Sequence, residues 1–97
     1  PRALMGDADA RRLLLERMIE PLEHPKRGNA LTETALCLAG EGFQLLNTAK
    51  ALDIHISTLR YRVERIEHLL GISLDNPQDR FKLQVAAQLY RLVSEAF

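Results

Sequence analysis

Residues 44–70 have the sequence QLLNTAKALDIHISTLRYRVERIEHLL, which predicts a short helix, a tight turn and a second helix. Small or apolar side chains occupy the positions that a helix-turn-helix buries: Ala49, Leu52, Ile54, Leu59 and Val63. Polar and basic side chains occupy the positions that face outward: Ser57, Thr58, Arg60, Tyr61 and Arg65. We therefore expect a helix-turn-helix, a unit that places its second helix in the major groove of DNA.

The apolar spacing of the second helix indicates which face is buried. The inward positions recur at i, i+4, i+7 and i+11, which is one continuous helical stripe: Leu59, Val63, Ile66 and Leu70. At about 100° per residue, the side chains that point away from this stripe are Ser57, Tyr61, Glu64 and His68. Ala49 allows the first helix to approach closely, and Ile54 is expected to lie beneath the second helix.

The N-terminal half of the second helix is the part expected to enter the groove, so its outward side chains are candidates for contacting base edges. These candidates are Ser57, Thr58, Arg60 and Tyr61. An arginine can pair with guanine through two hydrogen bonds, and a threonine methyl can contact the methyl of thymine. The candidates for contacting the phosphate backbone are Lys50, His55, Arg62 and Arg65.

Two other interpretations remain open from spacing alone. The first is a plain helical hairpin, because charges four residues apart, such as Arg60 and Glu64, are common on solvated helices. The second is a protein-interaction or dimerisation module without direct DNA contact. The last helix favours it, because apolar residues cover more than half of its circumference. The same helix would also serve as the central core helix of a five-helix domain.

The amino-acid composition indicates DNA binding less clearly than this motif does. The chain has 13 Lys and Arg against 13 Asp and Glu, whereas DNA-binding domains are often clearly basic. Residues 44–70 hold four basic and three acidic side chains, so any positive surface must come from their placement. The single cysteine, Cys37, excludes a disulfide within the chain, and we expect it to be a buried apolar side chain in a reducing cytoplasm. No apolar run approaches the roughly 18 residues of a membrane span.

Glycine and proline divide the chain into about five helices, and no segment alternates with period two, so we expect an all-α fold. The expected helices cover residues 7–19, 30–39, 44–52 and 57–70, with the last one after Asn76. The expected N-caps are Asp7, Asn29, Ser57 and Asn76, and Gly71 ends the fourth helix. Residues 24–30 are expected to form a loop.

We predict one helical domain over residues 1–97, and a C-terminal piece of a longer regulator. Residues 1–43 would support the helix-turn-helix of residues 44–70, and residues 71–97 would form a long apolar C-terminal helix. The main stripe of that helix is expected to be Phe81, Val85, Leu89 and Leu92. Further apolar positions are expected to widen this stripe: Leu83, Ala86, Ala87, Tyr90 and Val93. One helix-turn-helix contacts few base pairs, so we expect a homodimer in the full-length protein.

Several short motifs occur in a fixed order around this segment. Ala49 and Leu52 precede the turn, followed by IH at residues 54–55, TLRYR at 58–62, RIE at 65–67, LG at 70–71 and NP at 76–77. This order resembles the C-terminal domain of the PucR/CdaR family, bacterial transcription regulators of purine and sugar-diacid catabolism. The resemblance implies a DNA-binding output domain that activates or represses a catabolic operon. It also implies a small-molecule effector that binds a region absent from this chain.

The sequence departs from the family pattern at two places. Ile56 and Ser57 stand where the family usually has Arg-Asn or similar polar residues, a difference that bears on base reading but not on docking. Asp53 stands where many helix-turn-helix units have glycine, so we expect a turn without a left-handed residue.

Catalysis is not expected from this chain. The three histidines, His24, His55 and His68, are 31 and 13 residues apart, and none has the i, i+4 partner of a helical metal site. The sequence has no glycine-rich phosphate loop. We therefore expect no enzyme, no metal site and no cofactor, and we expect double-stranded DNA as the partner, with no membrane association.

Overall fold

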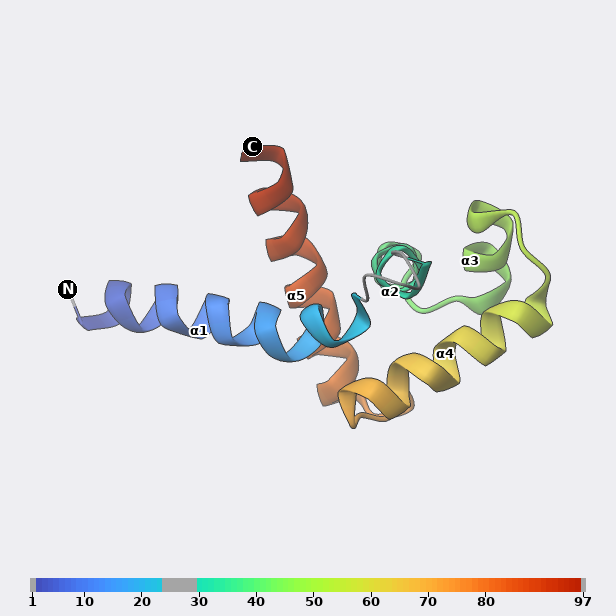
Figure 1. The fold of residues 1–97 in the computed structure, drawn as a ribbon, viewed down its shortest axis with the longest axis horizontal. Coiled ribbons are helices and arrows are strands. Elements are labelled where there is room, and N and C mark those ends of the chain that lie inside the picture. The colour runs from blue at the N-terminus through green and yellow to red at the C-terminus, as the bar shows by residue number, and fades with distance from the viewer. Residues whose placement is uncertain (1, 24–29, 97) are drawn as a thin grey trace.

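The computed structural model describes residues 2–23 and 30–96, with side chains described for residues 9–23 and 30–94. This part of the chain forms five α-helices and one short 3-10 helix (Figure 1). They are α1 (Arg2–Met18), η1 (Glu20–Leu22), α2 (Ala30–Gly40), α3 (Leu45–Leu52), α4 (Ile56–Leu70) and α5 (Pro77–Ala96). The predicted all-α class is confirmed. Most of the predicted loop, including the predicted cap at Asn29, lies outside the described residues.

The helix ends follow local chemistry, with one exception at the N-terminus. α1 begins at Arg2, so the start predicted at Asp7 is wrong. Ala3, Leu4 and Met5 are strong helix formers, and the helix extends through them. The expected end of α4 is confirmed, because Gly71 has a left-handed backbone with φ 66°.

The start of α5 is set by the predicted cap. The side chain of Asn76 accepts hydrogen bonds from the backbone amides of Gln78, at 2.8 Å, and Asp79, at 3.4 Å. Pro77 is the first residue of the helix, where its missing amide hydrogen costs nothing. Asp79 adds a negative charge to the first turn, which the helix dipole favours.

The hydrophobic core lies where α1, α2, α4 and α5 meet. Its buried members are Met18, Ile19, Leu22, Ala35, Leu38, Ile66, Leu74, Leu83 and Ala86. α5 contributes Leu83, Ala86 and Ala87, whereas Phe81 and Leu92 are 66% and 63% exposed. The predicted main stripe of α5 is therefore wrong at Phe81 and Leu92, and Leu83, Ala86 and Ala87, which were predicted to widen it, form the buried side instead. α5 packs against both α1 and α2, and small alanines on its inner face let these neighbours approach.

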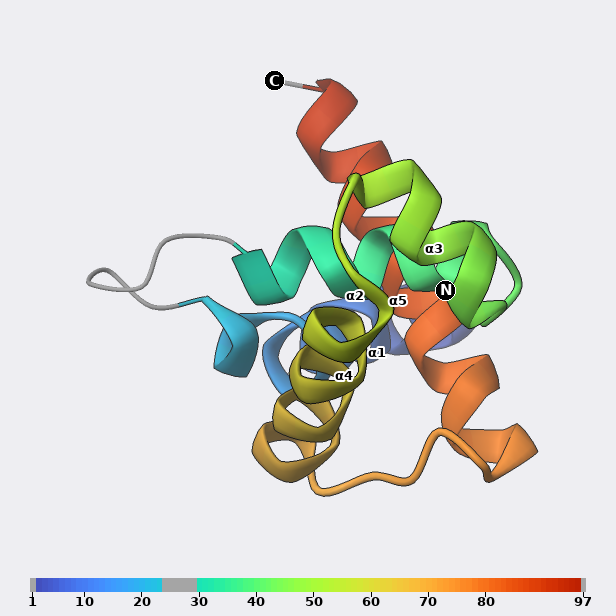
Figure 2. The ribbon, with the colours of Figure 1, turned by 90° about the vertical axis from the view of Figure 1, so that its right-hand side faces the viewer.

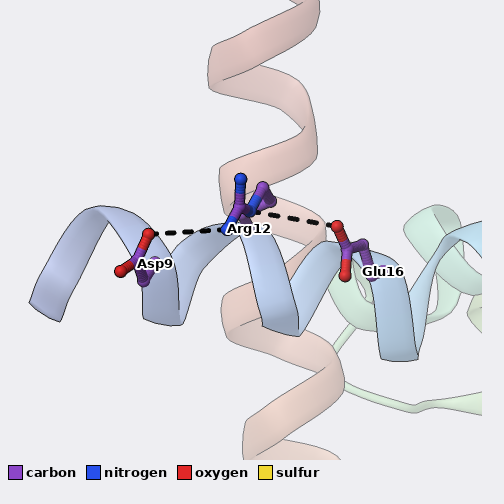
Figure 3. Close-up of polar contacts among 3 residues, drawn as sticks. All are labelled: Asp9, Arg12 and Glu16. Atoms are coloured by element: carbon purple, nitrogen blue, oxygen red, sulfur yellow. Dashed lines mark ion pairs between the residues drawn. The ribbon is translucent and has the colours of Figure 1, made fainter.

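α1 packs against α5 with its C-terminal part, and its N-terminal part extends beyond the other helices (Figure 1). Its outer side has ion pairs from Arg12 to Asp9, at 3.6 Å, and to Glu16, at 3.9 Å (Figure 3). The Arg12 and Asp9 side chains are both 72% exposed, so these pairs add little stability. Among the described helices, none is both long enough and apolar enough to cross a membrane.

The segment between α4 and α5 is held by side chains from both helices. The carboxylate of Glu67 on α4 accepts a hydrogen bond from the amide of Leu74, at 2.8 Å. The carboxylate of Asp79 on α5 accepts one from the amide of Ser73, at 3.1 Å. The guanidinium of Arg80 donates to the carbonyl of Leu74. These bonds fix the place where α5 begins relative to the end of α4.

Cys37 lies on α2 and is half-buried, so it is less buried than the sequence predicted. Partial burial raises the pKa of the Cys37 thiol, and the negative charge of Glu41 raises it further, with Arg91 acting in the opposite direction. Arg91, on α5, donates a hydrogen bond to the carbonyl of Leu36, at 3.0 Å. This bond ties α5 to the C-terminal part of α2.

Candidate nucleic-acid interface

The helix-turn-helix consists of α3, the turn at residues 53–55, and α4 (Figure 2). Ala49 is 6% exposed, as its predicted role in close packing requires. Next to it, the hydroxyl of fully buried Thr48 donates to the carbonyl of Gln44, at 2.7 Å. This bond joins Thr48 to the residue at the N-terminal end of α3.

The turn depends on a left-handed residue, contrary to our expectation. Asp53 has φ 55° and ψ 49°, and its amide and that of Ile54 bond back to the last carbonyls of α3. Aspartate tolerates this conformation better than most residues that carry a side chain. Asp53 thus replaces glycine without changing the type of turn.

α4 begins at Ile56, and its N-cap is His55 rather than the predicted Ser57. The Nδ1 atom of His55 accepts a hydrogen bond from the amide of Ser57, at 3.1 Å, and lies 2.8 Å from the Ser57 hydroxyl. Because Nδ1 acts as an acceptor, the proton of the neutral ring belongs on Nε2. The cap therefore orients the exposed His55 ring with a donor at its outer nitrogen.

The two faces of α4 are separated as the spacing predicts. Leu59 and Ile66 are fully buried, and Val63 and Leu70 are half-buried against the core. The outward positions are all exposed: Ser57, Tyr61, Glu64 and His68. Tyr61, at 63%, is among the most exposed large apolar side chains described. The inward and outward faces expected from the sequence are confirmed.

The structure divides the proposed DNA contacts into two groups. Thr58, Tyr61, Arg62 and Arg65 lie together and line one wall of a cavity of about 310 Å³. Its other wall comes from η1 and the start of α2, through Leu22, Ala30 and Leu31. Ser57, Arg60, His55 and Lys50 are exposed and lie outside this cavity.

Two residues that organise this region were absent from our sequence-based candidates. Thr34 on α2 is fully buried and accepts a hydrogen bond from the guanidinium of Arg62. Glu67 holds the segment after α4 through the amide of Leu74. No spacing rule identifies Thr34, because its partner is 28 residues away. In the sequence, Glu67 was identified only as part of the RIE motif at residues 65–67.

Among the described residues, no group of three or more His, Cys, Asp or Glu side chains lies close enough together to hold a metal ion. His55 is engaged in the cap of α4, and His68 is exposed on the same helix. His24 lies outside the described residues.

Comparison with known proteins decides the family. The family model described as the PucR C-terminal helix-turn-helix domain matches residues 31–89. This chain belongs to that family. The match includes α3, the turn and α4, as well as most of α2 and of α5. The resemblance to PucR/CdaR regulators that the short motifs indicated is thereby confirmed.

Two relatives of this PucR-type domain are named as regulators. The carbohydrate diacid regulator of Escherichia coli is 39% identical over 87 residues, which are 90% of this chain and 22% of that protein. The purine catabolism regulatory protein of Bacillus subtilis is 43% identical over 51 residues, or 53% of this chain and 10% of that protein. This chain thus spans about a fifth or less of these relatives. Both relatives are named as regulators rather than as enzymes, which agrees with the expectation that the chain is not an enzyme.

A solved structure shows the same arrangement of helices. It is the regulator of polyketide synthase expression from Bifidobacterium adolescentis, with a TM-score of 0.75 and 33% sequence identity. The match covers 94% of this chain and 38% of that one. The fold of this PucR-type helix-turn-helix domain is therefore shared with part of a solved regulator.

Proposed function

We propose that this domain binds duplex DNA sequence-specifically by placing the N-terminal half of α4 in the major groove. The observation that carries the proposal is the exposed polar face of that half-helix. Its members are Ser57, Thr58, Arg60 and Tyr61. Fully buried Leu59 lies within the same stretch and fixes the rotation of this face relative to the core.

Each exposed side chain has a role that its chemistry suits. Arg60 pairs with the two acceptors of guanine, and the Thr58 methyl contacts thymine. Lys50 on α3 and Arg65 on α4 contact phosphates on either side of the groove, since charge without base pairing gives affinity rather than sequence information. The Nε2 atom of His55 donates to a phosphate, because Nδ1 is occupied by the cap.

The whole protein is proposed to control a catabolic operon in the bacterial cytoplasm. Two relatives are named for carbohydrate diacids and for purine catabolism, which supports this kind of target. Both relatives extend far beyond the matched region, so we place the binding of a small-molecule effector in sequence outside this chain. In this arrangement residues 1–43 support the reading unit at residues 44–70, and residues 71–97 complete one domain.

We also propose that the regulator acts as a homodimer. Leu92 and Val93 are neighbours near the end of α5 and are 63% and 48% exposed, so they offer an apolar contact to a second copy. Pairing of two copies would double the contact with DNA and set the spacing of two half-sites. The same exposed side chains support the second candidate function, a protein-interaction module without DNA contact.

Fluorescence anisotropy with a labelled random-sequence duplex tests the DNA-binding proposal. The wild-type chain should bind at low salt and weaken steeply as salt rises, because phosphate contacts release counterions. Arg60→Ala/Arg65→Ala should lose binding while circular dichroism shows an intact fold. The matched control is Arg11→Ala/Arg12→Ala, which removes two exposed positive charges from α1.

Two results would contradict the proposal. One is equal weakening by the α1 double variant, which would mean that net charge alone drives the association. The other is a folded chain that does not bind even at about 50 mM salt, where phosphate contacts are strong. A chain dimerised through a fused coiled coil should then be measured. If that dimer also fails to bind, the protein-interaction module is the better interpretation.

A further inference from the structure

Arg62 differs from the other proposed contacts of α4 because its side chain is hydrogen-bonded to a different helix. It is half-buried, and its Nη1 atom donates a hydrogen bond to the hydroxyl of Thr34 on α2, at 3.3 Å. Thr34 is fully buried, and its hydroxyl in turn donates to the carbonyl of Ala30, at 2.7 Å. The Thr34 oxygen has used its one proton and therefore accepts from Arg62.

We propose that Arg62 is a positioning residue for DNA binding, and that it acts through Thr34 rather than by contacting a phosphate. This inference rests on the proposed function of α4 and replaces the phosphate contact that the sequence suggested for Arg62. The class of ligand is unchanged: it is duplex DNA, read by the neighbouring side chains of the same helix.

The position of Arg62 on α4 explains why this bond affects reading. Arg62 follows directly after Arg60 and Tyr61, and it lies on the flank of the helix that faces α2. Its bond to Thr34 crosses from the recognition helix to a buried hydroxyl, so it resists rotation of α4 about its own axis. Rotation would turn Arg60 and Tyr61 away from the base edges together.

The surroundings of Arg62 favour a fixed guanidinium over one that reaches into solvent. The cavity beside it has apolar walls from Leu22 and Leu31. Arg65 lines the same cavity, and the described residues give it no hydrogen bond like the one from Arg62 to Thr34. Arg65 therefore serves as the natural comparison: a half-buried arginine of the same helix, three residues away, with a proposed phosphate contact.

The first test is the salt dependence of binding to a labelled random-sequence duplex. Arg62→Met keeps a long apolar side chain but removes the donor and the charge. A positioning role predicts that the dissociation constant rises on the order of three- to tenfold, because fewer molecules hold α4 in the competent orientation. The slope of log Kd against log salt should match that of wild type. Arg65→Met, the control, should lower that slope by about one.

The second test removes the acceptor instead of the charge. Thr34→Val should raise the dissociation constant by the same factor as Arg62→Met, and the double variant should be no weaker than either single variant. Thr34→Ser keeps the hydroxyl and should bind like wild type. All measurements are made well below the unfolding transition of every variant, where a loss of stability alone leaves the dissociation constant unchanged.

The outcomes separate this inference from the proposed function. If neither the wild-type chain nor its coiled-coil dimer binds the duplex at low salt, both are overturned. If wild type and Arg65→Met behave as expected but Arg62→Met also lowers the salt slope by about one, only the positioning role is overturned. Wild-type affinity in Thr34→Val likewise overturns it. Should Thr34→Val fail to fold, equal affinity of Arg62→Met and wild type would decide against the inference.

Discussion

At the scale of single residues, Asp53 shows how the turn tolerates a side chain in a left-handed conformation. Asp53→Val should lower the free energy of unfolding by about 1–2 kcal/mol, because a β-branched residue strongly disfavours this backbone region. Asp53→Gly should change it by less than about 1 kcal/mol, since relief of strain offsets the added freedom of the unfolded chain. Urea unfolding of both variants provides the measurement. Equal losses would show that the carboxylate, and not the backbone, is what matters here.

At the scale of elements, the carboxylate of Glu67 on α4 holds Leu74 in the segment that leads to α5. Glu67→Ala leaves the buried Leu74 without its hydrogen bond to that carboxylate, so the free energy of unfolding should fall by about 1–3 kcal/mol. Glu67→Gln keeps an acceptor and should lose less. Glu64→Ala, an exposed site on the same helix, should stay within about 0.5 kcal/mol of wild type. A similar loss in Glu64→Ala would attribute the effect to the helix itself.

At the scale of the whole molecule, the shape is elongated, with extents of 47 × 29 × 21 Å. α1 and α5 extend away from the core in different directions (Figure 1). If pairing uses the end of α5, Leu92→Asp/Val93→Asp should abolish concentration-dependent association in sedimentation velocity without lowering the melting temperature. Leu46→Asp changes another exposed leucine, on α3, and should leave association intact. Association that persists in the α5 variant would move the proposed dimer contact elsewhere.

The helical spacing of α4 was sufficient to predict which side chains face outward, because that property depends only on the period of the helix. Other features depend on neighbours that spacing does not describe. Whether Leu83 or Phe81 marks the buried side of α5 depends on where α1 and α2 cross it. The bond from Arg62 to Thr34 requires the packed fold, and so does the choice of His55 as the cap. The DNA contacts themselves remain predictions.

The separation of the two faces of α4 has a consequence for how such regulators diversify. The side chains that hold the helix in place, Leu59 and Ile66, are distinct from those exposed toward DNA. Substitutions at exposed Arg60 therefore leave the buried side chains of α4 in place. A domain with this fold can therefore bind a different operator sequence after a few surface substitutions, while the buried side chains that stabilise it stay the same.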